Sequence, residues 1–401
     1  ILFEDSIELQ NISETADVEK MKDLLLGLGA KIEKGSMMID ASNLTSTDLD
    51  TEISRSMRSS VVTTGPILAR YGKVSFPSPG GCVIGTRPVD LFFESYKKMG
   101  ATVVENDGMF RLTAPKGGLR GADIFYPIQS VGATETIMMA AVLAKGTTTL
   151  RNCAMEPEIV SVAEWLNDCG ADIVGAGTTT ITIRGGKPLK AKKPYIAIPD
   201  RIETGSFLLL GALCADELLI SNCEPRHVEA VTNQLVGAGV PLEIKKDSIL
   251  IKGNGRIKNT SFHGCSIRTH EYPGFPTDLQ PIMTVFLSQT TGESIVFETI
   301  FEGRFKYVDD LRKLGANVTV MNPREIFVQG PTLYKASPAG EELTAYDIRA
   351  GFAVVLAALC ANGTSVINNV YFIDRGYEAL EKTLSGLGAD VQRIYGEKIT
   401  D

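Results

Sequence analysis

A glycine-rich segment, Pro79–Asp90, brings a thiol and a guanidinium group close together in the first quarter of the chain. Glycine lets a loop backbone approach a ligand, and loops of this kind often carry function. Cys82 follows two glycines, and the nearby Arg87 would favour the thiolate form of its side chain, which is the nucleophilic form. The segment therefore predicts a reactive thiol at a binding site. The plainer alternative is a surface loop with an incidental cysteine.

Charged and hydroxyl side chains also recur where apolar helices are expected to begin. Arg58, Ser130, Asp278 and Asp347 each stand just before such a helix. A helix N-terminus attracts anions because its first N–H groups are unpaired and carry partial positive charge. For each residue taken alone, a helix cap or a solvated ion pair is the plainer alternative.

The arginines could together hold a small polyanion. A guanidinium group binds carboxylate or phosphate through two parallel hydrogen bonds. Arg375 lies in the loop Phe372–Tyr377, and Phe301–Phe305 is a second arginine-containing loop at the matching place of the preceding repeat. The predicted anion cage consists of Arg58, Arg87, Arg349 and Arg375.

The elements that must position these residues repeat along the chain. A helix-ending glycine, usually in a Gly-Ala pair, returns roughly every 70 residues, at positions 29, 100, 170, 239, 315 and 388. Glycine suits this place because it adopts the left-handed conformation at a helix end without strain. Each repeat also contains an apolar helix, such as Ser206–Cys214 or Gly351–Cys360, and then a short β segment such as Gly363–Ile367. An amphipathic helix, such as Glu158–Cys169 or Tyr377–Leu387, belongs to each repeat as well. A helix that is apolar all round is expected to be buried.

Six such units predict an α/β chain (α+β by some schemes) of two domains, 1–198 and 199–401, with three units in each. Each domain would pack three buried helices inside a shell of sheets. Compared with the other five, the first unit lacks its opening strand and the start of its buried helix. We therefore expect the natural protein to have roughly 30 further residues before Ile1, because a half-built buried helix would expose apolar surface.

Composition and charge argue against several other classes of protein. The net charge of −8 is unfavourable for non-specific binding to nucleic acid. The seven cysteines show no Cys-x-x-Cys spacing, and the three histidines show no metal-ligand spacing. The apolar runs fall well short of the ~20 residues that span a bilayer. We expect a protein without a metal, membrane or nucleic-acid partner.

The Pro79–Asp90 segment resembles the active-site loop of the UDP-N-acetylglucosamine enolpyruvyl transferases. Five further segments resemble motifs of the same family: Ser130–Thr134, Pro199–Gly205, Pro273–Asp278, Asp347–Ala350 and Asp374–Tyr377. The resemblance runs from Ile1 to about Arg393. Several independent motifs in the same order are far more specific than any one of them.

The resemblance implies that each domain is an inside-out α/β barrel of βαβαββ-type repeats, with the active site in the cleft between the domains. It implies transfer of the enolpyruvyl group of phosphoenolpyruvate to the 3-hydroxyl of UDP-N-acetylglucosamine by addition and elimination, with release of phosphate. No cofactor or metal takes part, and these two small molecules are the partners implied. The family acts in the cytoplasm at the first committed step of peptidoglycan synthesis, on which cell shape, cell cycle and division depend. Its inhibitor fosfomycin alkylates the cysteine that matches Cys82.

The resemblance also implies roles for the residues that match the family's motifs. Cys82 would be the general acid or the covalent partner of phosphoenolpyruvate, and Asp278 the base near the sugar hydroxyl. Asp347 would support proton transfer or orient an arginine. The residues that would bind phosphoenolpyruvate are Arg58, Arg87, Arg349 and Arg375. Those that would bind the UDP-sugar are Arg87, Pro88, Val89, Asp90, Leu91, Ser130, Val131, Gly132, Thr277, Asp278 and Ile300.

The chain departs from the family pattern at two places. The family's Lys-Asn pair, whose lysine contacts phosphoenolpyruvate, would fall before Ile1, and Ile128 stands where some members have a lysine near the diphosphate. Two other functions stay open. The sister 3-phosphoshikimate enolpyruvyl transferase shares the repeats but has no such cysteine loop. A non-catalytic nucleotide-sugar-binding paralogue would keep the cleft and lack the lysine.

Overall fold

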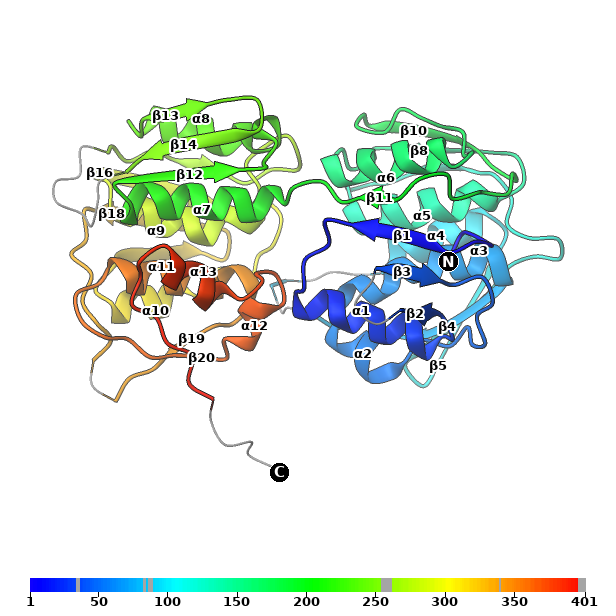
Figure 1. Cartoon of the computed structure of the whole chain (residues 1–401), viewed down its shortest axis with the longest axis horizontal. Coiled ribbons are helices and arrows are strands. Elements are labelled where there is room, and N and C mark those ends of the chain that lie inside the picture. Colours follow the sequence, from blue (N-terminus) through cyan, green and yellow to red (C-terminus); the bar gives the residue numbers. More distant parts are fainter. Residues whose placement is uncertain (34–36, 82–83, 86–88, 254–261, 339, 396–401) are drawn as a thin grey trace.

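The structure, a computed structural model, describes residues 1–33, 37–81, 84–85, 89–253, 262–338 and 340–395. It is a mixed α/β fold whose two lobes lie side by side (Figure 1). The N-terminal lobe contains the elements up to β11 (Tyr195–Ile196), and the C-terminal lobe begins at α7 (Arg201–Cys214). The predicted α/β class is confirmed.

The described part of the N-terminal lobe contains three sheets and the helices between them. The helices are α1 (Ala16–Gly27), α2 (Thr51–Ser56), the 3-10 helix η1 (Arg58–Thr63), α3 (Thr64–Tyr71), α4 (Asp90–Lys98), α5 (Val131–Leu143) and α6 (Pro157–Asp168). The first sheet has the order β11, β1 (Ile7–Gln10), β3 (Met38–Asp40), β2 (Lys31–Ile32). The second has the order β4 (Lys73–Pro77), β6 (Met109–Thr113), β5 (Thr102–Asn106). The third has the order β7 (Asp123–Phe125), β8 (Thr147–Arg151), β10 (Thr180–Arg184), β9 (Ile173–Val174).

The described part of the C-terminal lobe is organised in a similar way. After α7 its helices are η2 (Pro225–Val228), α8 (Glu229–Gly237), η3 (Thr277–Leu279), α9 (Gln280–Ser288), α10 (Val308–Lys313), α11 (Ile348–Cys360), α12 (Tyr371–Asp374) and α13 (Leu380–Gly386). One sheet has the order β12 (Glu217–Ser221), β14 (Ser248–Lys252), β13 (Leu242–Ile244). Another has the order β15 (Ile267–Arg268), β16 (Gly292–Phe297), β18 (Glu325–Gly330), β17 (Asn317–Asn322). The strands β19 (Leu343–Thr344) and β20 (Ile367–Asn368) pair with each other.

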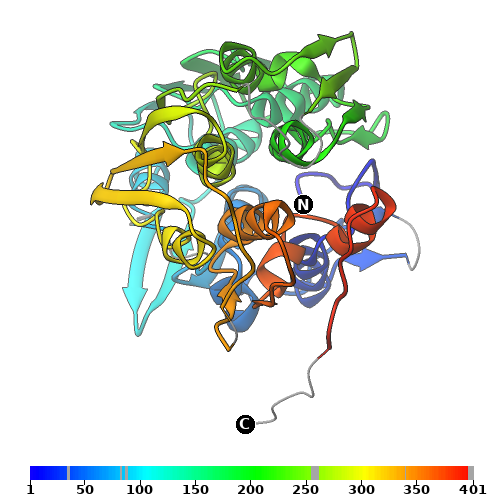
Figure 2. The same ribbon diagram turned by 90° about the vertical axis from the view of Figure 1, so that its left-hand side faces the viewer.

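Apolar helices occupy the centre of each lobe. Every side chain of α9 is buried, as are most side chains of α5, α7 and α11. In the C-terminal lobe α7, α9 and α11 contact one another and also contact the surrounding strands β12, β18 and β19 (Figure 2). The predicted burial of these helices is confirmed. Burial of apolar area, at about 25 cal/mol per Å², is the main term that stabilises such a centre.

The repeated glycines end helices as their spacing predicts. Gly29, Gly100, Gly170, Gly239, Gly315 and Gly388 follow α1, α4, α6, α8, α10 and α13, with φ between +91° and +109°. The last amphipathic helix, expected from Tyr377, begins only at Leu380, because Ala379 takes φ +44° and separates α12 from α13. The β segment expected over Gly363–Ile367 is also shorter, since β20 pairs with β19 only at Ile367 and Asn368.

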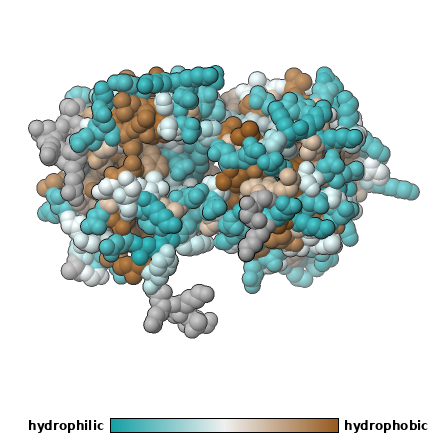
Figure 3. All heavy atoms as spheres, viewed as in Figure 1, coloured by the Kyte–Doolittle hydropathy of each residue, from teal (hydrophilic) through white to brown (hydrophobic). Residues whose placement is uncertain are grey.

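One face of the two lobes is mainly polar. On the face drawn in Figure 3, hydrophilic side chains cover much of both lobes and apolar side chains show in smaller areas between them. Among the described residues, no helix combines the length and the apolar character needed to cross a membrane. The molecule therefore presents charged and hydroxyl groups to solvent around its apolar helices.

One of these helices carries a carboxyl group in a partly buried position. Glu135 lies in the first half of α5, where burial, and then the neighbouring carboxylates of Glu158 and Glu156, raise its pKa from 4.5 to about 8. The folded state therefore holds a proton that the unfolded chain releases in this pH range. Stability that comes from this proton is fully present below about pH 4.5 and is lost as the pH rises towards 8.

We expect Glu135→Gln to remove this dependence on pH. In the wild type the free energy of unfolding should fall by up to about 1.4 kcal/mol per pH unit through this range, because one proton is released on unfolding. The stability of the variant relative to the wild type should therefore increase from pH 5 to pH 8. Urea unfolding at both pH values measures it, with Glu94→Gln on the exposed face of α4 as the control. An identical pH slope in variant and wild type would contradict the prediction.

Candidate functional site

A carboxylate held by two arginines lies at the start of α9. Asp278 accepts a hydrogen bond from Arg304 Nη2 at 2.7 Å, and Arg349 Nε lies 3.4 Å from its other oxygen. Asp278 and Arg349 are two of the predicted residues, and the fold brings them together across 71 residues of sequence. Arg304 was not among the predicted residues. The signal for it was the arginine-containing loop Phe301–Phe305, which matches the loop that carries Arg375.

The two guanidinium groups set the charge of Asp278. Burial opposes ionisation of this carboxyl, but the charges of Arg304 and Arg349 outweigh that effect and hold its pKa below the usual range. Asp278 is therefore an anion at neutral pH. A proton acceptor must be unprotonated before it can act, so this pairing keeps the carboxylate ready for that role.

One donor atom of Arg349 has no acceptor among the described residues. Its side chain is 12 % exposed, and its guanidinium lies over the ring of Tyr377, 5.2 Å from the centroid. Among the described residues, Nη1 of Arg349 and Nε of Arg304 have no hydrogen-bond partner. A buried donor without an acceptor is costly, so an acceptor placed next to either atom would stabilise the cluster.

Asp347 and Ser130 act as helix caps in this structure. Asp347 Oδ1 accepts hydrogen bonds from the N–H groups of Arg349 and Ala350 at the start of α11, at 2.8 and 2.9 Å. Ser130 Oγ accepts one from Ala133 at the start of α5, at 3.3 Å. The cap of Asp347 fixes the backbone of Arg349 and so the direction from which its side chain enters the cluster.

Two of the predicted UDP-sugar segments lie next to each other in the N-terminal lobe. A Cβ atom on Gly132 would stand 3.3 Å from the ring of Phe92, so the first turn of α5 packs closely on α4. Val89–Leu91 form the start of α4, and Ser130–Gly132 form the start of α5. The structure therefore places the N-terminus of α5, which Ser130 caps, beside the 89–91 segment. Ile300 lies in the C-terminal lobe, where its N–H donates to Glu298.

Arg375 takes part in a contact between the lobes. Its Nε and Nη2 donate to the two carboxylate oxygens of Asp17 on α1, at 2.7 and 3.1 Å, and its side chain is 4 % exposed. The Glu378 carboxylate accepts the N–H of Glu14 at 2.9 Å in the same region. A Cβ on Gly376 would lie 3.3 Å from Arg349 Nη1, so Arg375 and Arg349 come from adjoining segments.

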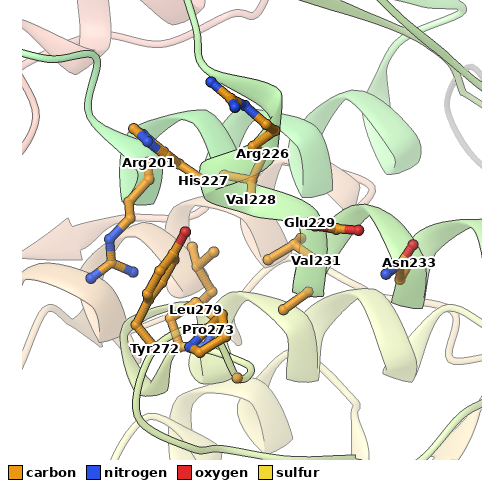
Figure 4. Close-up of a pocket in the computed structure, with 13 residues that line it drawn as sticks. Arg201, Arg226, His227, Val228, Glu229, Val231, Asn233, Tyr272, Pro273 and Leu279 are labelled. Carbon is orange, nitrogen blue, oxygen red and sulfur yellow. The ribbon is translucent and has the colours of Figure 1, made fainter. Parts of the chain in front are cut away.

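A second ion pair joins the lobes at Arg201. Its guanidinium forms two hydrogen bonds with the carboxylate of Glu158 on α6, at 3.2 and 3.3 Å, and lies 5.5 Å from the ring centroid of Tyr272. Arg201 and Tyr272 also line a cavity of about 250 Å³ in the C-terminal lobe. Figure 4 shows these side chains together with Arg226 and His227 around that cavity.

The glycine-rich segment is described at residues 79–81, 84–85 and 89–90. Cys82, Arg87 and Pro88 lie outside the described residues. Before the gap, Gly80 donates its N–H to the Ser54 carbonyl at 3.0 Å, next to the 3-10 helix that Arg58 opens. A side chain at Gly80 would overlap the backbone of α2, which explains a glycine here.

At Ile84 and Gly85, the same segment contacts the C-terminal lobe. The carbonyl of Ile84 accepts the N–H of Gly303 at 3.1 Å. A Cβ on Gly85 would stand 3.2 Å from the carboxylate of Glu302. The described part of the segment therefore lies against the Phe301–Phe305 loop that carries Arg304.

The site as a whole combines cationic donors with one ionised carboxylate at the junction of two lobes. Among the described residues, no group of three or more His, Cys, Asp or Glu side chains could hold a metal ion. Guanidinium groups bind the phosphate or carboxylate of a small molecule, and Asp278 can accept a proton. Such a site suits proton transfer on a polyanionic substrate.

Comparison with known proteins identifies the family. A family model described as EPSP synthase (3-phosphoshikimate 1-carboxyvinyltransferase) matches residues 1–384. UDP-N-acetylglucosamine 1-carboxyvinyltransferase of Desulforapulum autotrophicum is 40% identical over 396 residues, which cover 98% of this chain and 92% of that protein. The protein of the same name from Granulibacter bethesdensis is 41% identical over 400 residues, which cover 99% and 92%. UDP-N-acetylglucosamine 1-carboxyvinyltransferase 2 of Bacillus subtilis is 40% identical over 403 residues, which cover 100% and 90%.

Solved structures share the fold at lower identity. The enolpyruvyl transferase NikO from Streptomyces tendae superposes with a TM-score of 0.82 at 23% identity, over 97% of this chain and 90% of that one. EPSP synthase from Acinetobacter baumannii gives a TM-score of 0.69 at 17% identity, over 96% and 90%. Taken with the sequence matches, these likenesses show that the chain belongs to the EPSP synthase family, among its members named UDP-N-acetylglucosamine 1-carboxyvinyltransferase.

Proposed function

We propose that this protein transfers the enolpyruvyl group of phosphoenolpyruvate to the 3-hydroxyl of UDP-N-acetylglucosamine and releases phosphate. The observation that carries the proposal is the cluster in which Asp278 lies between Arg304 and Arg349 while Arg349 Nη1 has no acceptor among the described residues. The cluster supplies an ionised base and a donor for an anion at one place. The names of the relatives, at about 40% identity over nearly the whole chain, support this choice of substrates.

The reaction needs three proton transfers and charge stabilisation. The oxygen of the sugar 3-hydroxyl bonds to C2 of phosphoenolpyruvate, its proton passes to Asp278, and a proton is added at C3. The resulting tetrahedral ketal then loses a proton from C3 and the C2–O bond to phosphate breaks, which restores the double bond. Fixed guanidinium groups stabilise the negative charge of both phosphate and carboxylate along this path.

The remaining assignments follow from the family motifs. Arg58, Arg87, Arg349 and Arg375 bind phosphoenolpyruvate. Cys82 donates the proton to C3 or bonds to the substrate, and Asp347 orients Arg349 through the start of α11. Residues 89–91, 130–132, 277–278 and 300 contact the UDP-sugar, together with Arg87 and Pro88.

The proposal extends to the architecture and to the cellular role. The domains divide at 198/199, each is an inside-out barrel of three repeats, and the active site lies between them. The two separate clusters of buried apolar residues, Leu2–Leu189 and Ile202–Leu384, support this division. The protein acts in the cytoplasm in peptidoglycan synthesis, and fosfomycin would alkylate Cys82.

A second acceptor deserves a direct comparison because the matching family model is described as 3-phosphoshikimate 1-carboxyvinyltransferase. We expect the full-length protein to release phosphate from phosphoenolpyruvate with UDP-N-acetylglucosamine and not with shikimate 3-phosphate. Cys82→Ala should lower this rate by about 100-fold or more, because general acid catalysis contributes about that much. Phosphate release is measured colorimetrically for both acceptors.

Three results of this assay have distinct meanings. Turnover only with the nucleotide sugar supports the proposal. Turnover only with shikimate 3-phosphate replaces the acceptor while leaving the enolpyruvyl transfer in place. No turnover with either acceptor, in a folded protein that binds UDP-N-acetylglucosamine in calorimetry, would identify a non-catalytic binding protein.

The charge of Arg304 should determine the pH below which kcat falls. Arg304→Gln removes the larger of the two charges that lower the pKa of Asp278, so that pKa should rise. A protonated Asp278 cannot accept the sugar proton, so activity should be lost as the pH falls, at a higher pH than in the wild type. We expect the midpoint of the acid limb of kcat to lie about one pH unit or more higher in Arg304→Gln than in the wild type, since a neighbouring guanidinium lowers the pKa of a carboxyl by about 1–3 units. The control is Arg226→Gln, which alters an exposed arginine paired locally with Glu224; an unshifted acid limb in Arg304→Gln would contradict the prediction.

A further inference from the structure

A fully buried carboxylate lies behind the site and is not part of the roles proposed above. Glu298 directly follows β16 and has 0 % exposure. Its Oε1 accepts hydrogen bonds from the Thr269 hydroxyl at 3.0 Å and from the N–H groups of Ile300 and Phe301 at 2.8 and 3.0 Å. Its Oε2 accepts the Thr277 hydroxyl at 2.9 Å. A buried carboxylate is costly to desolvate, and four donors compensate that cost.

One of these bonds leads directly to the proposed base. Thr277 precedes Asp278 in the chain, and its Oγ1 also accepts a hydrogen bond from Arg304 Nη1 at 2.9 Å. The other end of that guanidinium, Nη2, binds Asp278 at 2.7 Å. Glu298 therefore connects to Asp278 both through the backbone at Thr277 and through the guanidinium of Arg304.

The other bonds lead to the turn that faces the N-terminal lobe. Residues 298–304 leave the sheet at Glu298 and lead to Arg304, which binds Asp278. Arg324 Nη1 fastens the start of this turn by donating to the carbonyls of Glu298 and Thr299, at 3.2 and 2.7 Å. Further along, Gly303 donates its N–H to Ile84 of the other lobe at 3.1 Å. The turn thus joins the base, Ile300 and the end of the glycine-rich segment.

Only a carboxylate can accept all of these hydrogen bonds at this place. Every neighbour of the Glu298 oxygens is a donor, and a carboxylate is an acceptor on both atoms. A glutamine could still accept at Oε1 from Ile300 and Phe301. Its NH₂ group would then face the Thr277 hydroxyl, which could no longer donate in that direction.

We propose that Glu298 is a positioning residue that fixes the 277–278 turn and the 300–301 turn in one arrangement. It acts on Asp278 through Thr277 and Arg304, so that the carboxylate meets the sugar hydroxyl at the right place. The inference rests on the proposed function, because there Asp278 and Ile300 are assigned to the acceptor sugar. A misplaced base lowers the rate of the chemical step more than it weakens binding of the other substrate.

The first test uses turnover of the full-length protein with UDP-N-acetylglucosamine. Glu298→Gln should lower kcat about tenfold or more, while KM for phosphoenolpyruvate changes by less than about twofold. Thr277→Val should act in the same direction, because it removes the hydroxyl that links Glu298 to Arg304. The matched control is Thr290→Val, a fully buried threonine whose hydroxyl bonds only to the Leu287 carbonyl among the hydrogen bonds described, at 2.7 Å.

A second measurement needs no turnover. Hydrogen–deuterium exchange of the 276–279 turn, where Leu279 donates to the Pro276 carbonyl at 3.0 Å, should be about tenfold faster or more in Glu298→Gln than in wild type. The amides of Ile300 and Phe301 should stay protected in Glu298→Gln and lose protection in Glu298→Ala.

The outcomes separate this inference from the proposed function. An inactive wild type with the expected exchange pattern would overturn the reaction and support the positioning role of Glu298. An active wild type would overturn the positioning role if Glu298→Gln lost no more kcat than Thr290→Val. Unchanged hydrogen–deuterium exchange of the 276–279 turn in Glu298→Gln would overturn the positioning role, whichever acceptor substrate the protein uses.

Discussion

Asp278 accepts a hydrogen bond at 2.7 Å from Arg304 and lies 3.4 Å from Arg349, and both arginines are largely buried. Removing the Asp278 carboxylate would leave two largely buried guanidinium groups without their shared counter-charge, which is destabilising. The surrounding structure must therefore hold three side chains from three separate segments. It does so with the cap of α11 at Asp347, the turn after β16 and the start of α9.

The apolar helices provide the rigid support for this cluster. Helices α7, α9 and α11 contact one another in the C-terminal lobe, and α9 and α11 begin beside the charged residues. Their interiors are apolar, so the polar groups that the fold must satisfy are concentrated at the helix starts. The same starts are the places where an anion is best received. The same helices thus form the apolar core and place the charged residues at their N-termini.

The sequence was sufficient to predict those elements and part of the site. Periodic glycines indicated the helix ends, because a left-handed residue at a helix end has a local cause, and apolar runs indicated the buried helices. The partner of Asp278 at Arg304, the pair Arg375–Asp17 and the buried Glu298 could not be derived in this way. The Arg375–Asp17 contact joins residues 358 positions apart, and no local pattern in the sequence specifies it. Ala379, whose φ is +44°, moves to Leu380 the start of a helix that periodicity alone places at Tyr377.

Among the described residues, two ion pairs between the lobes have the same polarity, since each joins a carboxylate of the N-terminal lobe to a guanidinium of the C-terminal lobe. They differ in exposure, because the Glu158 side chain is 40 % exposed and that of Asp17 is 25 % exposed. Mobile ions screen charges through the solvent, over a Debye length of about 8–10 Å at physiological ionic strength, and screen a more exposed pair more strongly. Rising ionic strength therefore weakens the Glu158–Arg201 ion pair before the Asp17–Arg375 ion pair. The two lobes would then rotate about the less exposed Asp17–Arg375 pair, instead of moving apart equally at both ion pairs.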